Sequence, residues 1–334
     1  MSKDKNSLEA KYLDSIKSNT QGNKSLAERF KAKAVELARE GYFGSLKTRK
    51  QQLQNCYANL VNLIDQPEVP VLIYGETGSG KRRIIEEYLV LSNFYRRLDG
   101  SSKSTLRVLN AKFLRNGWTD LLSIASNKEG DFIYLENVDE LTWDQQKELS
   151  AFLTHNYLSP ELGCPRLFFG TEKALSMLII QKQFSRSLFK QITQFAIFLP
   201  SLNERQEDIP HLIQTLAYED SGYKQNPPVW FVNFASSQLW GRNIDELKLL
   251  LKNMLLKQKN MKYWKKSDIP RLYTTTTNSS FTPASPVDIT KVQEYRVNLK
   301  KALVISHGDK RKAAGQLGMS KAEILRKMLE YRVR

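Results

Sequence analysis

The chain has 334 residues, enough for two or three domains, and its 41% hydrophobic and 26% charged content excludes wholesale disorder. No apolar run is long enough to cross a membrane, and the N-terminus lacks the apolar core of a signal peptide. The two cysteines, Cys56 and Cys164, and the three histidines lie far apart, so we expect neither a disulfide framework nor a metal site. A cytoplasmic protein is expected.

The N-terminal segment, residues 1–50, is polar and rich in lysine. It is predicted to be an extension, helical or partly disordered, that is too short for an independent sensor domain. A helix is plausible from Ser25 to Glu40, because apolar side chains recur at helical spacing. Its apolar face is predicted to hold Leu26, Phe30, Ala34 and Leu37.

Residues 51–204 alternate strand-like and helix-like runs, which is typical of an α/β domain with a parallel sheet. Strands are predicted at residues 69–74, 105–109, 131–136, 166–170 and 194–199. A small helical subdomain is expected over residues 205–262. Residues 263–288, rich in Thr, Ser and Pro, are predicted to be a linker to a last domain, residues 289–334.

A complete phosphate-binding loop follows the first predicted strand. It consists of Gly75, Glu76, Thr77, Gly78, Ser79, Gly80 and Lys81. Glycines let the backbone N–H groups surround a phosphate chain, and Lys81 supplies a charge for the outer phosphates. A helix predicted over Arg82–Leu91 would point its N-terminus at the anion, so strand, loop and helix together predict an anion site.

The last domain carries much of the net charge of +16, since residues 291–334 hold twelve Lys or Arg against four Asp or Glu. We predict three helices there, at about 290–306, 309–317 and 321–331. Ser320 and Glu323 form a capping-box pair that starts the third helix. The spacing is that of a helix-turn-helix, whose second helix reaches base edges in the major groove of double-stranded DNA.

The residues expected to contact DNA fall into two groups. Basic side chains of the first helix of the pair are placed for phosphates, and the start of the second helix is placed for the groove. The phosphate candidates are Lys310, Arg311 and Lys312, and the groove candidates are Ser320, Lys321, Ala322, Arg326 and Lys327. A generic helical hairpin is the alternative.

These segments resemble the NtrC-like, sigma-54-dependent bacterial enhancer-binding proteins, which join an AAA+ domain to a Fis-type helix-turn-helix. Residues 71–81 are similar to the family's Walker A segment, and residues 308–320 to its helix-turn-helix. Residues 199–210, LPSLNERQEDIP, match the LPPLRERxEDIP segment, and residues 240–247 fall on WPGNVREL. The resemblance implies a P-loop AAA+ core with a parallel sheet, a helical lid and a C-terminal all-α DNA-binding domain.

This sequence departs from the family where the chemistry of hydrolysis resides. The Walker B pair, Asp-Glu in the family, is Glu136-Asn137 here; the resemblance implies that the Asp helps to hold Mg²⁺ and the Glu orients the attacking water, and Asn137 cannot accept a proton. The two arginine-finger positions hold Ser185 and Gln191, and the sensor-II arginine position holds Asp245. Thr171 remains at the end of the sensor-I strand, and Arg82 follows the P-loop lysine.

A further departure lies between the second predicted strand and the Walker B strand. Only 25 residues separate Asn110 from Glu136, and none of them resembles the GAFTGA loop through which the family contacts sigma-54. We therefore predict a degenerate member that has lost this loop.

Three functions remain open. The first is a DNA-binding transcription regulator with a hydrolysis-deficient AAA+ domain that cannot remodel sigma-54 polymerase. The second is a working ATPase that uses displaced residues such as Asp139 with Arg186. The third is an anti-activator that joins an active AAA+ relative without binding DNA.

The resemblance also implies ligands and partners. ATP or ADP with Mg²⁺, or cyclic di-GMP as a static effector, is expected near the P-loop, together with Arg82 and Thr171. Double-stranded DNA, self-association as a dimer or higher oligomer, and a regulatory protein at the N-terminal segment are the expected partners. A bacterial, nucleoid-associated location follows, with no membrane partner.

Overall fold

A computed structural model describes residues 25–114, 131–156, 165–221, 227–258 and 261–270, together with Tyr273, Ser306 and Asp309. The chain divides into two compact units, Met1–Asp268 and Ile269–Arg334. The helices and strands described below all belong to the first unit.

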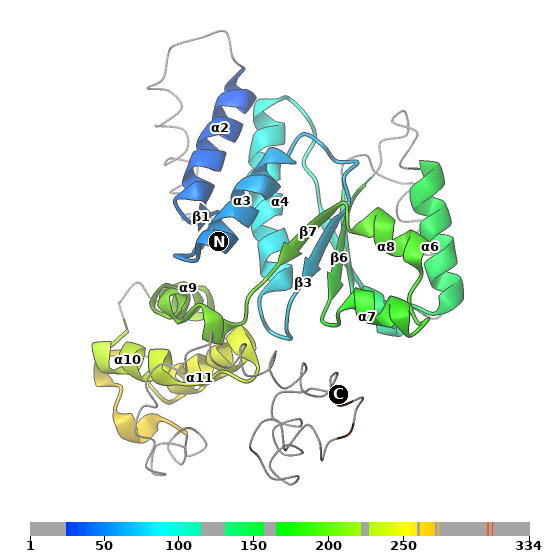
Figure 1. Ribbon diagram of the computed structural model, residues 1–334. Helices are drawn as coiled ribbons and strands as arrows, with labels where there is room; N and C mark the ends of the chain where they lie inside the picture. The colour runs from blue at the N-terminus through cyan, green and yellow to red at the C-terminus, as the bar shows by residue number, and fades with distance from the viewer. Residues whose placement is uncertain are drawn as a thin grey trace. The chain divides into compact units, whose positions relative to one another are not determined.

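A five-stranded parallel sheet forms the centre of the first unit (Figure 1). Its strands are β3 (Val71–Tyr74), β4 (Leu106–Asn110), β5 (Phe132–Glu136), β6 (Arg166–Thr171) and β7 (Phe195–Phe198), in the spatial order β4-β5-β6-β3-β7. All four pairings are parallel. Each of the five predicted strands is thereby confirmed. Because parallel strands end at the same edge, the loops after β3, β5 and β6 gather there.

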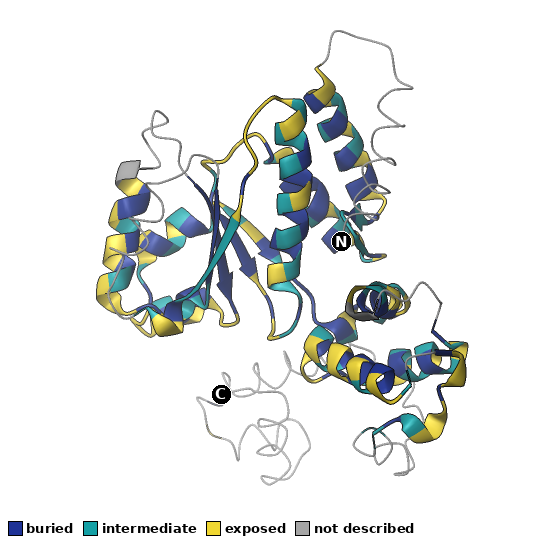
Figure 2. Ribbon diagram, turned by 180° about the vertical axis from the view of Figure 1, so that it is seen from behind, coloured by how far each residue is buried: buried dark blue, intermediate teal, exposed yellow. Residues whose placement is uncertain are grey.

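Helices cover both faces of the sheet (Figure 1). One face packs against α2 (Leu26–Arg39), α3 (Gln51–Asn62) and α4 (Lys81–Leu98), and the other against α6 (Trp143–Asn156), α7 (Leu175–Ile180) and α8 (Arg186–Ile192). Successive strand residues therefore enter different cores. Ile73 and Phe168 lie in the first core, whereas Leu72 and Phe169 lie in the second. Because the sheet is covered on both faces, the three central strands, β5, β6 and β3, are mostly buried (dark blue in Figure 2) and read as continuous apolar runs in the sequence.

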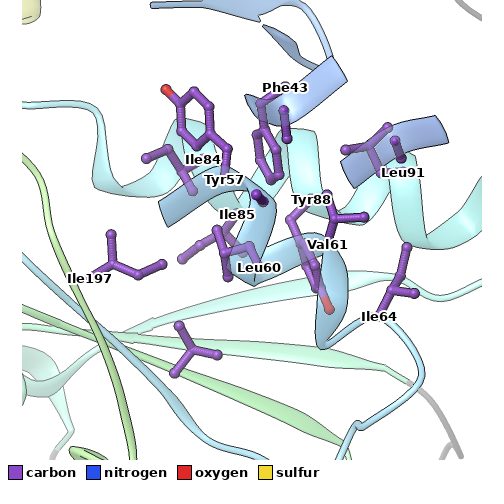
Figure 3. Close-up of a cluster of buried hydrophobic side chains, with 14 of the residues drawn as sticks. Phe43, Tyr57, Leu60, Val61, Ile64, Ile84, Ile85, Tyr88, Leu91 and Ile197 are labelled. Atoms are coloured by element: carbon purple, nitrogen blue, oxygen red, sulfur yellow. The ribbon is translucent and has the colours of Figure 1, made fainter. Parts of the chain in front are cut away.

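The first core is filled by large side chains from the helices over the sheet (Figure 3). Tyr88 of α4 contacts both Phe132 and Phe168, with ring centroids 5.6 and 5.7 Å apart. Tyr57 of α3 stacks on Phe43 at 4.6 Å. These contacts join the P-loop helix α4 to the sheet, and α3 to the segment before it.

The N-terminal helix α2 is part of this core and does not project from it. Ser25 and Glu28 form a capping box at its start. Phe30, Ala34 and Leu37 are buried as predicted, but Leu26 is 53% exposed and Ala27 takes its place on the buried face. The expectation for Leu26 was wrong because the buried stripe of α2 passes through the residue three positions before Phe30, Ala27, and not through the one four positions before it. A short hairpin, β1 (Tyr42–Phe43) and β2 (Leu46–Lys47), then leads into α3.

Three helices form the lid of the unit, as the helical patterning of residues 205–258 predicts. They are α9 (Ile209–Ser221), α10 (Val229–Ser237) and α11 (Asn243–Lys257). Trp240 is fully buried between α10 and α11, and its indole N–H donates to the carbonyl of Ala235 at 3.0 Å. This anchor fixes the start of α11.

Single turns of 3-10 helix complete the first unit. They are η1 (Ala111–Phe113), η2 (Val138–Glu140), η4 (Leu202–Glu204), η5 (Gln206–Asp208), η6 (Met261–Tyr263) and η7 (Lys266–Asp268). Across the described residues, no helix combines the length and apolar composition needed to cross a membrane.

Candidate nucleotide site

The phosphate-binding loop lies between β3 and α4, as predicted, and α4 begins at Lys81 and runs on to Leu98, beyond the predicted end. Gly78 and Gly80 adopt φ values of +70° and +100°, in the left-handed region that glycine favours. The first N–H groups of α4 have no partner within the helix and face the loop. The backbone is therefore shaped to receive an anion.

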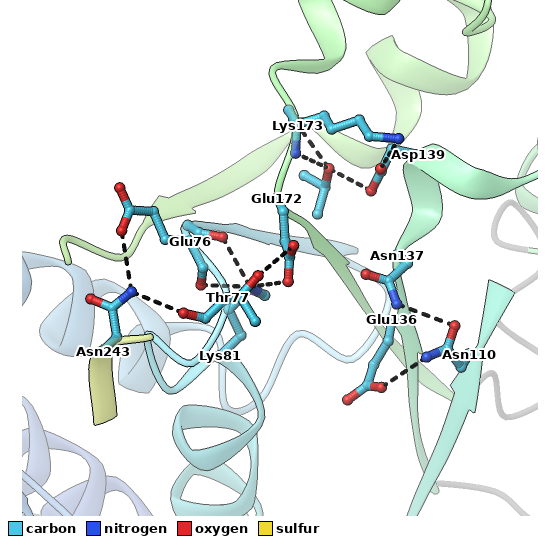
Figure 4. A network of polar contacts seen from close by, with 12 residues as sticks. Glu76, Thr77, Lys81, Asn110, Glu136, Asn137, Asp139, Glu172, Lys173 and Asn243 are labelled. Carbon is cyan, nitrogen blue, oxygen red and sulfur yellow. Dashed lines mark hydrogen bonds and ion pairs between the residues drawn. The ribbon is translucent and has the colours of Figure 1, made fainter. Parts of the chain in front are cut away.

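Lys81 is bound within its own loop (Figure 4). Its ammonium group donates to the carbonyls of Gly75 at 2.9 Å and Glu76 at 3.0 Å, and lies 3.6 Å from Glu172 Oε1. Thr77 Oγ1 donates to the other Glu172 oxygen at 2.7 Å. Burial lowers the pKa of Lys81, while the charge of Glu172 acts in the opposite direction.

A cavity of about 510 Å³ opens from this loop. Its walls come from the P-loop, from α4, from the hairpin before α3, from the ends of β5 and β6, and from the lid helices α9 and α11. The Ser79 hydroxyl is buried and has no hydrogen-bond partner among the described residues. A volume of this size suits a small molecule, and the unsatisfied hydroxyl, the glycine turn and the helix start suit a phosphate-bearing one.

The lid contacts the loop directly. Asn243, fully buried at the start of α11, donates to the Thr77 carbonyl at 2.9 Å and to Glu76 Oε2 at 3.2 Å, while its own oxygen accepts from Leu202 N–H at 2.7 Å. The N–H of Ile244 donates to the Gly78 carbonyl at 3.0 Å. These bonds hold the carbonyl side of the loop and leave the opposite side to a ligand.

Arg205 braces the loop from the segment that precedes α9. Its buried guanidinium donates to the Ser79 carbonyl, and burial lowers its pKa. Asp208, three residues on, accepts from Thr48 Oγ1 at 2.7 Å and from Arg49 N–H at 2.9 Å, and burial raises its pKa. Both residues line the cavity and connect lid, loop and hairpin.

The Walker B position has an altered geometry. Glu136 ends β5 and lines the cavity, and Asn137 follows it with φ +56°, in the left-handed region. The Asn137 amide donates to Asn110 Oδ1 at 3.2 Å, and the Asn110 amide lies 3.5 Å from Glu136 Oε2 (Figure 4). An amide side chain accepts no proton, and the N–H side of this one is already bonded to Asn110.

The displaced carboxylate Asp139 is committed elsewhere. Its side chain is 3% exposed, accepts from Thr171 Oγ1 at 2.8 Å and lies 3.3 Å from Lys173 Nζ. Thr171 ends β6 as predicted, but its hydroxyl points to Asp139, and neither residue is among those that line the cavity. Asp139 is therefore a structural partner of the sensor-I strand and not a base facing the ligand.

Neither finger position reaches the cavity of its own chain. Ser185 caps α8, accepting from Leu188 N–H at 3.4 Å, and Gln191 bonds Ser150 and Thr154 of α6, each at 2.8 Å. Arg186 and Lys190 are exposed on α8. The two family positions thus serve helix capping and helix packing.

The structure also places residues that the sequence analysis did not single out. These are Asn243, Arg205 and Glu172, which contact the P-loop. Arg205 and Asn243 lie inside the two family-like lid segments, so those segments could have drawn attention to them. Glu172 carries no such signal, because only the approach of β6 to β3 brings it beside Thr77.

No group of three or more potential ligands drawn from His, Cys, Asp and Glu occurs among the described residues. Arg82 occupies the place after Lys81 and pairs with Glu86 at 2.9 Å. Glu136 alone of the predicted Walker B pair could reach a Mg²⁺ ion carried in with a nucleotide.

The DNA-binding candidates lie outside the described residues. This applies to Lys310, Arg311, Lys312, Ser320, Lys321, Ala322, Arg326 and Lys327, and to residues 115–130, which include most of the interval in which the GAFTGA loop was sought.

Comparisons with known proteins agree with this architecture. Residues 50–202 match the sigma-54 interaction domain. The chain is 24% identical over 318 residues to the formate hydrogenlyase transcriptional activator of Salmonella typhimurium, covering 86% of this chain and 44% of that protein. It is 25% identical to the DNA-binding transcriptional regulator NtrC of a Bradyrhizobium species, covering 65% and 49% respectively. The chain thus spans less than half the length of these curated relatives.

Solved structures share the fold. NtrX from Brucella abortus, crystallised with ATP, superposes with a TM-score of 0.53 at 16% identity, covering 92% of this chain and 74% of that one. Domain III of the Thermotoga maritima replication initiation protein DnaA superposes with a TM-score of 0.52 at 13% identity, covering 71% and 96%. Parallel sheet, P-loop, lid and sequence matches lead to one conclusion: the chain has an AAA+ fold, its residues 50–202 match the sigma-54 interaction domain, and it is similar to bacterial transcriptional regulators such as NtrC.

Proposed function

We propose that this protein is a DNA-binding transcription regulator whose AAA+ domain binds a nucleotide but does not hydrolyse it. The observation that carries the proposal is the use of the catalytic positions for other bonds. Asn137 is held by Asn110, Ser185 caps a helix, and Gln191 joins two helices. None of these groups has a carboxylate to accept a proton from water or a positive charge to offset that of a transferred phosphoryl group.

The retained half of the site supports nucleotide binding. The glycine turn, Lys81 and the cavity are all present, and NtrX, which shares the fold, has been crystallised with ATP and with ADP. When bound, the nucleotide would supply the phosphate chain that the loop surrounds. The lid, through Asn243 and Ile244, would hold the loop's carbonyls while the N–H groups face the phosphates. Cyclic di-GMP is a second effector that a cavity of this size admits.

Regulation without hydrolysis requires the nucleotide to act as a static effector. The basic region at residues 291–334 would then deliver the function by binding double-stranded DNA, with self-association providing two-fold contact. The segment before α2 remains a candidate contact for a regulatory protein.

The test is steady-state ATP hydrolysis by the full chain and by Lys81→Ala. We expect the two to release phosphate at the same background rate, because the wild type lacks water-activating and charge-stabilising groups. Hydrolysis by the wild type that Lys81→Ala abolishes would contradict the proposal and favour an ATPase with displaced catalytic residues. A nucleotide-binding measurement on the same preparations shows whether the P-loop binds a nucleotide.

A further inference from the structure

The cavity beside the P-loop is balanced in charge, although a polyphosphate is strongly negative. Its basic lining residues are Lys47, Lys81, Arg82, Arg83, Arg205 and Lys248, and its acidic ones are Glu86, Glu136, Glu172, Asp208, Glu219 and Asp245. Among the described residues that line the cavity, six carboxylates therefore stand against six cations. A site that must hold several adjacent phosphates ordinarily presents a clear positive excess.

Several of the cations are already engaged. Arg82 pairs with Glu86 at 2.9 Å, and Arg83 pairs with the buried Glu87 at 2.8 Å and with Glu219. Arg205 donates to the Ser79 carbonyl. A bound phosphate would have to compete with these partners.

Two carboxylates flank the loop itself. Glu172 bridges Thr77 and Lys81, contacting the two groups that would meet the outer phosphates (Figure 4). The Oδ2 atom of Asp245, on the first turn of α11, lies 3.0 Å from the position that a Cβ atom on Gly78 would occupy. Each added phosphate brings more negative charge and three more acceptor oxygens toward these carboxylates.

We infer that the cavity takes a nucleoside diphosphate in preference to the triphosphate, with Glu172 and Asp245 as the residues that set this preference. A diphosphate needs only the loop N–H groups and one face of Lys81. A terminal phosphate needs Glu172 to leave Lys81 and then lies against a carboxylate in a partly enclosed space, where like charges repel more strongly than in water. The inference rests on the proposed retention of nucleotide binding.

A divalent cation could reverse this preference by neutralising both the phosphate and the carboxylates. The described residues offer no group of three or more acidic, His or Cys ligands, and Arg82 follows Lys81 where most P-loops have Ser or Thr. Binding is therefore measured both with Mg²⁺ and with EDTA, and the preference is expected in both.

The experiment is isothermal titration calorimetry of the full chain with ADP and with ATP. We expect ADP to bind at least tenfold more tightly. Glu172→Gln and Asp245→Asn change exposed residues and are nearly isosteric. Each is expected to lower the ratio of the ATP to the ADP dissociation constant at least threefold, because it strengthens ATP binding. Glu36→Gln removes the same charge from an exposed site outside the cavity and should leave the ratio unchanged. Thermal unfolding verifies that each variant is folded.

The outcomes distinguish the proposed nucleotide binding from the inferred preference for a diphosphate. Absence of binding to both nucleotides would overturn the proposed nucleotide site, and the inference with it. ATP binding as tight as ADP, or tighter, would overturn only the diphosphate preference. A preference for ADP that both variants leave unchanged would overturn the assignment to Glu172 and Asp245, since the neutral amides keep the shape and remove only the charge.

Discussion

At the residue scale, the positions that correspond to the family's catalytic residues make structural hydrogen bonds in this protein. Asn137, Ser185 and Gln191 are not empty positions, because each makes a specific bond that stabilises the fold. The substitutions are readable from the family-like motifs, but the bonds are not, since partners such as Asn110 and Thr154 lie tens of residues away. Reintroducing one catalytic residue would therefore also remove a structural contact.

Asn137 allows a direct measurement of backbone strain at the Walker B position. Its φ of +56° is tolerated by asparagine and glycine and costs other residues about 1–2 kcal/mol. We expect Asn137→Ala to be less stable than Asn137→Gly by about 1 kcal/mol in urea unfolding, although glycine normally destabilises. Both variants lose the amide bond to Asn110, so the difference isolates the backbone conformation. Equal stabilities, or a more stable alanine variant, would contradict this geometry.

At the element scale, the N-terminal helix α2 is an integral part of the AAA+ domain. It lies before the segment that matches the sigma-54 interaction domain, yet it contributes Phe30, Ala34 and Leu37 to the core above the sheet. The hairpin and α3 then connect it to the P-loop helix α4. The Ser45 hydroxyl accepts a hydrogen bond from Arg83 of α4 at 2.8 Å and donates one to Glu87 at 2.6 Å. Changes in α2 should therefore destabilise the nucleotide site.

Phe30 tests this role. Its ring is fully buried, 4.6 Å from that of Phe94 of α4. We expect Phe30→Ala to lower the free energy of unfolding by about 3–5 kcal/mol, because it removes a large side chain and leaves a cavity. Leu26→Ala, in the same helix but exposed, should change it by less than about 0.5 kcal/mol. Similar effects of the two substitutions in urea unfolding would show that α2 does not pack as described.

At the scale of the whole molecule, the chain combines a nucleotide-binding unit with a basic C-terminal region. The first unit ends at Asp268, and half of the net charge, +8 of +16, lies in residues 291–334, where twelve Lys or Arg stand against four Asp or Glu. Lysine and arginine that neutralise phosphates release counterions, so DNA affinity should fall steeply as salt rises. The nucleotide would act on this binding only by favouring one state of the first unit over another.

Removal of the C-terminal region tests where DNA is bound. We expect a chain ending at residue 288 to lose DNA binding in fluorescence anisotropy, and Arg326→Ala to weaken a specific site by about 1–3 kcal/mol. Lys310→Ala should weaken all sequences about equally and lower the salt slope by about one. Unchanged affinity of the truncated chain would rule out this region as the DNA-binding part and leave the anti-activator function open.

The sequence by itself determined the fold family, the five strands, the P-loop and the loss of the Walker B glutamate, because these depend on local apolar runs and on short contiguous motifs. The tertiary structure alone decided what surrounds the loop. Glu172 reaches Thr77 only because β6 pairs with β3, Asn243 reaches the same loop only because the lid folds back 166 residues later, and Leu26 turned out exposed. Such contacts join residues distant in the chain, and no local pattern encodes which of them meet. The P-loop therefore indicates an anion site, and the carboxylates that the fold brings to it determine which anion is favoured.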